Sequence, residues 1–309
     1  LQNTKKIVKI KKDIHLNILI FIQGDEKMYQ KIENQIFGEE RALYGQNHLL
    51  LNQCRFEGIE DGESALKEAN HIKIMHCFFD LRYPLWHNHS IYMEQSLMST
   101  NCRAPLWYSE NIKIYHTEIQ GIKTLRESKD IFIANSTIHS PEFGWRCHCI
   151  QVLNTFLESE YAFFESQNIE IENMQFVGKY SFQYVHHMTI KNSHLSTKDA
   201  FWHTNHVTVI DSTLEGEYLG WYSKNLTLIR CHIKGTQPLC YCKNLTLIDC
   251  TMEDTDLSFE NSSVHASICS DIVSIKNPKK GKITVQSYQQ LILENPKNKT
   301  KIIVQTKGD

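Results

Sequence analysis

The chain has 309 residues and a formal net charge of −2, from 33 basic and 35 acidic residues. This balance leaves no excess of positive charge for a nucleic-acid partner, so we expect none. Hydrophobic residues make up 41% of the chain, with only 13 Gly and 6 Pro, which excludes a disordered or collagen-like polymer.

A basic and then apolar segment opens the chain. Lysines crowd the first twelve residues, and an apolar run follows from Ile14 to Ile22. The run is too short to span a bilayer, is interrupted by His15 and Asn17, and is not followed by a small-residue cleavage site. We therefore expect residues 1–37 to be an N-terminal extension and cap, and we expect no membrane partner.

From Leu49 onward one apolar pattern returns twelve times. Its first and third positions are aliphatic, its sixth is a small residue or Cys, its eighth is apolar, and its other positions hold any residue. The last nine starts of the pattern are each 19 residues apart. The starts are Leu49, Ile72, Ile91, Ile112, Ile131, Ile150, Ile169, Met188, Val207, Leu226, Leu245 and Val264. Such regular spacing is typical of a repeat architecture.

Within each repeat the apolar residues alternate in short, often β-branched bursts, which indicates strands rather than helices. Coils stacked about 4.8 Å apart would place like residue over like residue and bury a continuous core. The sequence therefore predicts an all-β chain, a single-stranded right-handed parallel β-helix (solenoid) of about twelve coils over residues 38–270. Gly121, Gly178, Gly216 and Gly235 recur ten residues before a coil start, where sharp corners need left-handed backbone.

Short strands continue after the last repeat. They are predicted at Ile272 to Ile275, Ile283 to Val285 and Ile302 to Val304, with Asn-Pro turns between them. Since a final coil would otherwise offer a free edge to aggregation, we expect residues 271–309 to form a C-terminal β cap.

Nine of the ten cysteines fall into two groups. Cys54, Cys77, Cys231, Cys250 and Cys269 share one predicted inward row, where small thiols pack well. The pairs at 147 and 149 and at 240 and 242 resemble metal ligands, but they lie five coils apart and cannot share an ion. We expect no metal site and no cofactor. Because many free thiols favour a reducing compartment, we expect a cytoplasmic protein.

A second predicted strand in each repeat carries an outward row with all five tryptophans. Lys67, Arg126 and Gln183 in that row are hard to bury without partners, which supports the outward assignment. The row reads Tyr44, Lys67, Trp86, Trp107, Arg126, Trp145, Phe164, Gln183, Trp202, Trp221, Cys240 and Phe259. An exposed aromatic row of this length indicates a binding surface.

Flat rings repeated along a face suit the apolar faces of sugar rings, and interspersed Arg and Lys suit hydroxyl or carboxylate groups. We therefore expect a carbohydrate chain, an oligo- or polysaccharide, to bind along this ladder. The predicted substrate-binding residues are Trp86, Trp107, Trp145, Phe164, Trp202 and Trp221, with Arg82 and Arg103 from a flanking row. The alternative is a non-catalytic scaffold whose aromatic face docks a protein or a second copy of the chain, as a homo-oligomer.

Charged residues flank the ladder near the middle of the rod. Glu127, Arg146 and Glu165 fall on successive coils, so the carboxylates lie two coils apart, about 9.6 Å, near the upper limit for an inverting glycosidase. Together with Arg126 they form the hypothetical catalytic centre of a hydrolase or lyase. Arg146 between them would keep both carboxylates ionised. An ionised carboxylate can act as a general base but not as a general acid. The alternative interpretation is that these residues form a structural ion ladder.

Eight segments resemble an uncharacterised bacterial family, the domain-of-unknown-function family 3737, over about residues 29–290. They are NQIFGEERALYG (34–45), DGESALKEA (61–69), LRYPLWH (81–87), SPEFGW (140–145), KYSFQY (179–184), TKDAFWH (197–203), GEYLGWYS (216–223) and GTQPLCYC (235–242). The stacked coils also look like the pectate-lyase and polygalacturonase superfamily. That resemblance implies the fold, but the chain departs from the calcium-binding acidic cluster of the lyases and the clustered aspartates of the hydrolases. Asp199 and Asp256 share a row but lie three coils apart.

Overall fold

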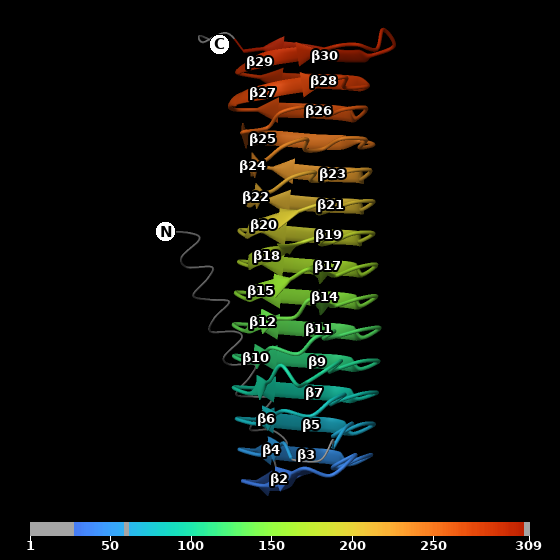
Figure 1. Cartoon of the computed structure of the whole chain (residues 1–309), viewed down its shortest axis with the longest axis vertical. Helices are drawn as coiled ribbons and strands as arrows, with labels where there is room; N and C mark the ends of the chain where they lie inside the picture. Colours follow the sequence, from blue (N-terminus) through green and yellow to red (C-terminus); the bar gives the residue numbers. More distant parts are fainter. Residues whose placement is uncertain (1–27, 59–61, 306–309) are drawn as a thin grey trace.

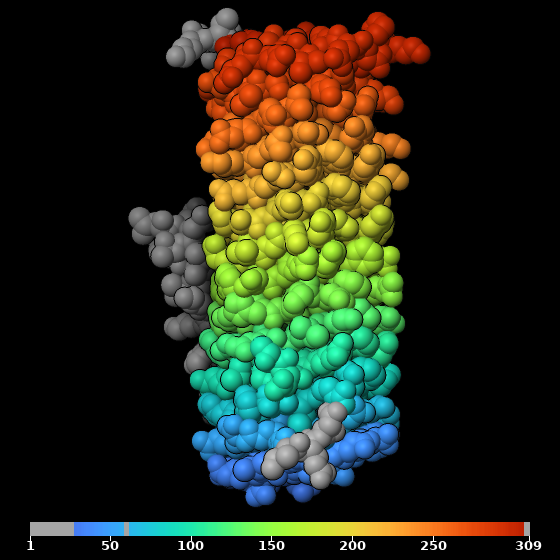
Figure 2. Space-filling model, viewed as in Figure 1, coloured from blue at the N-terminus to red at the C-terminus, as the bar shows by residue number. Residues whose placement is uncertain are grey.

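The computed structural model describes residues 28–58 and 62–305, and the apolar run at 14–22 lies outside this range. The described residues form thirty strands and no α-helix. The strands stack into a straight rod of about 14 turns, which confirms the predicted parallel β-helix with slightly more turns than twelve (Figure 1). Successive coils follow one another along the rod in sequence order (Figure 2).

The first sheet runs the full length of the rod and holds mostly six-residue strands, all paired in parallel. Its strands are β1 (Gln30–Glu33), β3 (Asn47–Asn52), β5 (Asn70–Met75), β7 (His89–Glu94), β9 (Glu110–Tyr115), β11 (Lys129–Ala134), β14 (His148–Leu153), β17 (Gln167–Glu172), β19 (His186–Lys191), β21 (Asn205–Ile210), β23 (Lys224–Ile229), β25 (Leu245–Glu253), β26 (Ser263–Ile268), β28 (Lys280–Val285) and β30 (Lys299–Val304).

The second sheet holds shorter strands on an adjacent side of the rod. They are β2 (Ile36–Phe37), β4 (Arg55–Phe56), β6 (Phe78–Phe79), β8 (Leu97–Met98), β10 (Glu118–Ile119), β12 (Thr137–His139), β15 (Phe156–Ser159), β18 (Gln175–Lys179), β20 (His194–Lys198), β22 (Thr213–Glu215) and β24 (His232–Lys234). Two further pairs are β13 (Glu142–Phe143) with β16 (Tyr161–Ala162) and β27 (Asp271–Lys276) with β29 (Ser287–Ile292). Strands β1, β2, β28 and β30 carry the stack into both ranges predicted as caps.

Residues one sequence repeat apart are the residues that pair between neighbouring coils. Ile112, Ile131, Ile150 and Ile169 lie directly over one another, and each is at most 2% exposed. Phenylalanine rings also stack in the core, with 4.6 Å between the centroids of Phe56 and Phe79. Because every coil repeats the same apolar positions, the core is continuous along the rod.

The third side, which we call the turn side, carries the tryptophan row. It was predicted as a second strand, but for most of its length alternate residues have positive φ, such as Ala104 (53°), Leu106 (61°) and Tyr108 (56°). Their backbone N–H groups donate alternately to the next and the preceding coil, at 2.8 Å to Ile122 O and 3.0 Å to Pro84 O. These inter-coil bonds hold a conformation that non-glycine residues ordinarily avoid.

Three row assignments differ from the sequence prediction. Cys269 is exposed rather than inward, and Cys240 and Phe259 are fully buried rather than outward. The differences lie where the repeat loses its regularity. The register shifts between β25 and β26, and the step from Ser258 to Ile275 is shorter than the 19-residue repeat.

Candidate functional site

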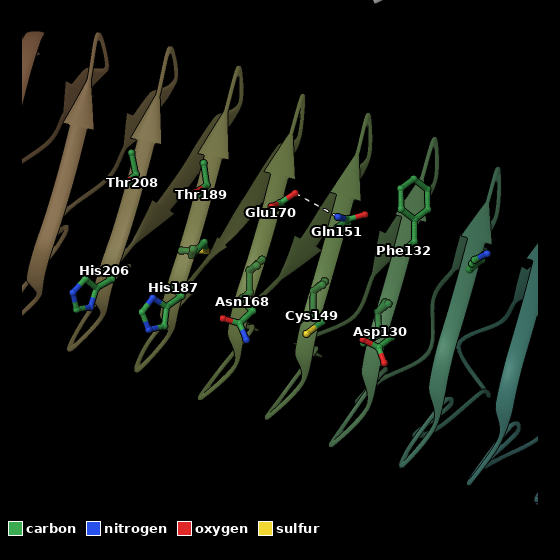
Figure 3. A pocket seen from close by; sticks show the side chains of 15 residues that line it. Asp130, Phe132, Cys149, Gln151, Asn168, Glu170, His187, Thr189, His206 and Thr208 are labelled. Atoms are coloured by element: carbon green, nitrogen blue, oxygen red, sulfur yellow. Dashed lines mark hydrogen bonds between the residues drawn. The ribbon is translucent and has the colours of Figure 1, made fainter. Parts of the chain in front are cut away.

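A shallow groove of about 640 Å³ lies on the outer face of the first sheet. Six successive strands, from β9 to β21, form its floor, so its long direction follows the axis of the rod (Figure 3). Five coil steps of about 4.8 Å give it a length of about 24 Å. The site is therefore an elongated groove rather than an enclosed cavity.

Two parallel rows of side chains line the groove, and each strand contributes one residue to a row (Figure 3). The first row is Asp130, Cys149, Asn168, His187 and His206, and the second is Lys113, Phe132, Gln151, Glu170, Thr189 and Thr208. First-row residues have positive φ, 57° at Asp130 and at His187, and the pairing register passes over them. They form a left-handed kink that is stacked from coil to coil.

The groove offers a mixed set of hydrogen-bonding groups. Gln151 Nε2 donates to Glu170 Oε2 at 3.4 Å, and the imidazoles of His187 and His206 stack with 5.0 Å between their centroids. Two carboxylates, of Asp130 and Glu170, stand against the single ammonium of Lys113. Carboxylates, amides, hydroxyls and imidazoles together can both accept and donate hydrogen bonds.

The sequence prediction did not single out these two rows. Polar residues at alternate positions of a strand are what any solvated sheet face shows, so they gave no distinct signal. The nearest signal was the recurrence of His187 and His206 one repeat apart. The positive-φ position recurs along the sheet from His48 to Asn244, so it does not mark the groove, and apolar periodicity does not reveal where the surface is hollowed.

The tryptophan ladder lies outside the core as predicted, with its rings partly buried. Trp86 and Trp107 stack at 5.2 Å between centroids with a 7° interplanar angle, and Trp202 and Trp221 stack at 5.4 Å with 6°. Each indole Nε1–H donates to a backbone carbonyl of the following coil, as from Trp202 to Tyr218 O at 2.8 Å. The indole rings thus bind one another and the backbone of the rod.

The hypothetical catalytic residues lie together on the turn side. Arg126 lies between two indoles, its Cζ 4.5 Å from the Trp107 centroid and 4.9 Å from that of Trp145, and its Nη2 is 3.3 Å from Glu142 Oε2. Arg146 contacts Glu165 at 2.7 Å (Nε to Oε2). Its Nη1 is 3.9 Å from Glu127 Oε1. This is the geometry of an ion ladder on an exposed surface.

The other predicted ladder residues take part in similar contacts. The Phe164 ring lies 5.2 Å from that of Trp145, between centroids, and Arg82 Nη2 lies 3.4 Å from Glu63 Oε2. Arg103 is exposed. The assignment of these residues to carbohydrate binding stays a prediction.

Eight of the ten cysteines are buried, and Cys149 and Cys269 are exposed. Burial raises the pKa of Cys77, Cys102, Cys147 and Cys240 to about 12 and that of Cys242 to about 11. In an unfolded chain a thiol has a pKa of about 8.5. The folded state therefore keeps protons that the unfolded state releases at alkaline pH.

We expect the free energy of unfolding to fall as the pH rises from about 9 to about 11, by up to about 1.4 kcal/mol per pH unit for each of these thiols, because the unfolded state then binds fewer protons. Urea denaturation at a series of pH values measures the slope. Replacing Cys147 and Cys242 with Ser should flatten it. An unaltered slope in the double variant would contradict this account.

Within residues 28–58 and 62–305, no three His, Cys, Asp or Glu side chains gather in a metal-binding arrangement. In that same range no helix has the length and apolar character needed to cross a bilayer.

Comparison with known proteins gives a family match and two distantly similar structures. Among solved structures, the A-module of the mannuronan C-5 epimerase AlgE4 from Azotobacter vinelandii is similar, with a TM-score of 0.33 and 8% identity over 90% of this chain and 88% of that one. QnrB1, a plasmid-mediated fluoroquinolone resistance protein, is similar with a TM-score of 0.16 and 9% identity over 74% of this chain and 92% of that one. These scores carry no argument about function.

No curated protein matches the chain. A family described as a protein of unknown function, DUF3737, matches residues 30–305, nearly the whole described range. This agrees with the segments that resemble that family in the sequence. The chain is therefore a member of the DUF3737 family.

Proposed function

We propose that the protein binds a linear carbohydrate chain that lies along the groove of the first sheet. The observation that carries this proposal is the pair of polar rows, which repeat at every coil along a groove several coils long. A ligand that presents hydroxyl groups at regular intervals can meet the same kind of partner on each coil. Phe132 adds an aromatic ring at one end of the second row, where a sugar can stack.

The charge of the groove narrows the class of ligand. Asp130 and Glu170 outnumber the one lysine that lines it, so a chain with an anionic group on every residue would meet repulsion there. The open and polar lining does not suit a compact apolar ligand, for which pockets are concave and largely hydrophobic. A neutral, hydroxyl-rich chain fits both properties.

The tryptophan ladder is the second candidate surface for the same ligand. Its indole N–H groups already bind backbone carbonyls, and stacked neighbours or Arg126 cover much of the ring faces. A sugar that bound at the ladder would contact mainly the edges of the rings and few free hydrogen-bond donors. We therefore place the carbohydrate in the groove.

Cys149 provides a direct test, because it lies in the first row of the groove and is exposed. Neutral cello-, xylo-, malto- and chito-oligosaccharides are screened for binding by calorimetry, and those that bind are added during alkylation by iodoacetamide. A bound chain should slow the alkylation of Cys149 in a saturable manner. Cys269, the other exposed cysteine, is the internal control and should react at an unchanged rate.

Two results would overturn the proposal. The first is that no saccharide of the panel binds. The second is binding that leaves the alkylation rate of Cys149 unchanged. If that binding were lost in Trp202→Leu, the ligand would belong on the ladder instead.

The hypothetical catalytic centre is tested with the same panel. Glu127, Arg146 and Glu165 each lie three residues before a first-row residue, around the corner between the turn side and the first sheet. Shortened products that disappear in Glu165→Gln would assign a hydrolysis to these residues. Binding without products would leave the protein a binding module.

A further inference from the structure

The second row of the groove does not stop where the groove ends. The second row continues from Thr208 through Thr227, Thr246 and His265 to Lys282 and Lys301, each directly paired with the next. Beside it, Ser263 pairs with Lys280, and Lys280 pairs with Lys299. The second row therefore ends in Lys282 and Lys301 on the last two strands of the first sheet, and Lys280 and Lys299 stand beside it.

These four residues, which we call the lysine array, form two like-charged pairs in register. Lys280 lies opposite Lys299, and Lys282 lies opposite Lys301, on neighbouring parallel strands. All four are exposed, and residues two apart on a strand share a face, so the four ammonium groups project from the same outer face. Like charges directly opposite each other are destabilising in a sheet.

No ion pair in the described part of the chain offsets this repulsion. The ion pairs found there include none with Lys280, Lys282, Lys299 or Lys301. Lys279 and Lys297 are exposed nearby in the sequence and add to the positive charge at this end of the rod. Edge lysines can serve to block aggregation, and this role fits Lys299 and Lys301, because β30 is the last strand of the sheet and pairs only with β28. It does not account for Lys280 and Lys282, because β28 is paired on both sides.

The charge changes sign along one continuous face. The groove carries the carboxylates of Asp130 and Glu170, while the lysine array, about four coils or 19 Å beyond Thr208, carries only positive charge. Polar uncharged residues, among them Thr227 and Thr246, separate the two regions. A ligand that follows the rows from the groove would meet these regions in a fixed order.

We propose that the lysine array binds an anionic group at one end of the glycan whose neutral part lies in the groove. This inference rests on the proposed function, and it adds that the ligand binds in one direction. The anionic group is a carboxylate, sulfate or phosphate, since lysine contacts any of them as a point charge. The array then selects chains long enough to reach from the groove to β28 and β30.

The test compares one neutral oligosaccharide, chosen from those that protect Cys149, with derivatives of the same chain. One derivative carries a carboxylate at the reducing end, made by oxidation to the aldonate, and another carries a phosphate at the non-reducing end. We expect one of the two to bind at least ten-fold more tightly than the neutral parent at low salt. The gain should vanish at high salt and for chains too short to span both regions.

Substitutions of lysines test whether the gain in affinity comes from the lysine array. In Lys282→Gln/Lys301→Gln the charged derivative should bind only as tightly as the neutral parent, and protection of Cys149 by the parent should be unchanged. Lys67→Gln/Lys198→Gln removes the same charge outside both rows and is the matched control, so it should keep the gain.

The inference is overturned if neither derivative gains affinity, if the control variant loses the gain equally, or if chains of every length gain alike. It is also overturned if the array binds vesicles of anionic lipid but not the charged saccharide. In each of these cases Cys149 is still protected by the neutral chain, so the proposed function stands. Loss of that protection in wild-type protein would instead count against the proposed function itself.

Discussion

Replacing Gly216 with Ala is expected to lower the free energy of unfolding by about 3–5 kcal/mol, or to prevent folding, because two costs combine at this residue. A Cβ there would lie 2.1 Å from the backbone oxygen of Thr197 on the preceding coil, and φ is +146°. Backbone cannot move aside as a flexible side chain can. Urea denaturation of the variant and of wild type gives the difference directly.

Gly45→Ala separates these two costs. Gly45 has φ of +65°, but a Cβ there would meet nothing within 4 Å. The variant should therefore lose only about 1 kcal/mol, the ordinary penalty of left-handed backbone for alanine. If both variants were equally stable, close approach between coils would not be what requires glycine at position 216.

The glycine row shows what sequence reasoning reached and what it missed. Gly121, Gly178, Gly216 and Gly235 were predicted at corners for their left-handed backbone, but positive φ is found only at the last two. At Gly121 and Gly178 a Cβ would instead lie 2.1 Å and 1.9 Å from carbonyl oxygens of the preceding coil. All four approach that coil too closely for a side chain, and close approach between coils is a property of the stack, not of the local sequence.

The fold itself could be predicted because each coil repeats the same burial pattern. A residue such as Ile131 is set over Ile112 and under Ile150 by the repeat alone. The turns beyond the predicted twelve were not recognised in the sequence because the apolar pattern weakens at the ends of the rod. There, β1 and β30 have few fully buried residues. Their membership in the stack is set by backbone pairing with the neighbouring coil rather than by apolar residues.

The site was harder to predict than the fold. Side chains that face solvent follow no apolar rule, so the rows of the groove and the lysine array differ from an ordinary surface only through their position. The tryptophan row was correctly placed outside the core, because Arg126 and Gln183 interrupt it. Its hydrogen bonds to the backbone could not be foreseen, since they require the positive-φ conformation that brings carbonyls such as Lys123 O to the rings.

Trp107→Ala tests whether the ladder stabilises the rod. We expect a loss of about 2–4 kcal/mol in the free energy of unfolding, from lost apolar burial, ring stacking and one hydrogen bond. The indole stacks on Trp86, donates to Lys123 O at 2.5 Å and lies against the Arg126 guanidinium. Trp107→Phe keeps most of the stacking and loses the donor, so it should cost less.

Tyr108→Ala is the matched control, because Tyr108 is the next residue, is 39% exposed, and stacks on His87 at 4.9 Å between centroids. Its loss should cost about 0.5–1.5 kcal/mol, the contribution of an aromatic pair, because more of its ring is already exposed. Urea denaturation compares the three variants with wild type. Equal stability of Trp107→Ala and Tyr108→Ala would mean that the indoles do not hold the coils together, and the ladder would then be free to serve a ligand.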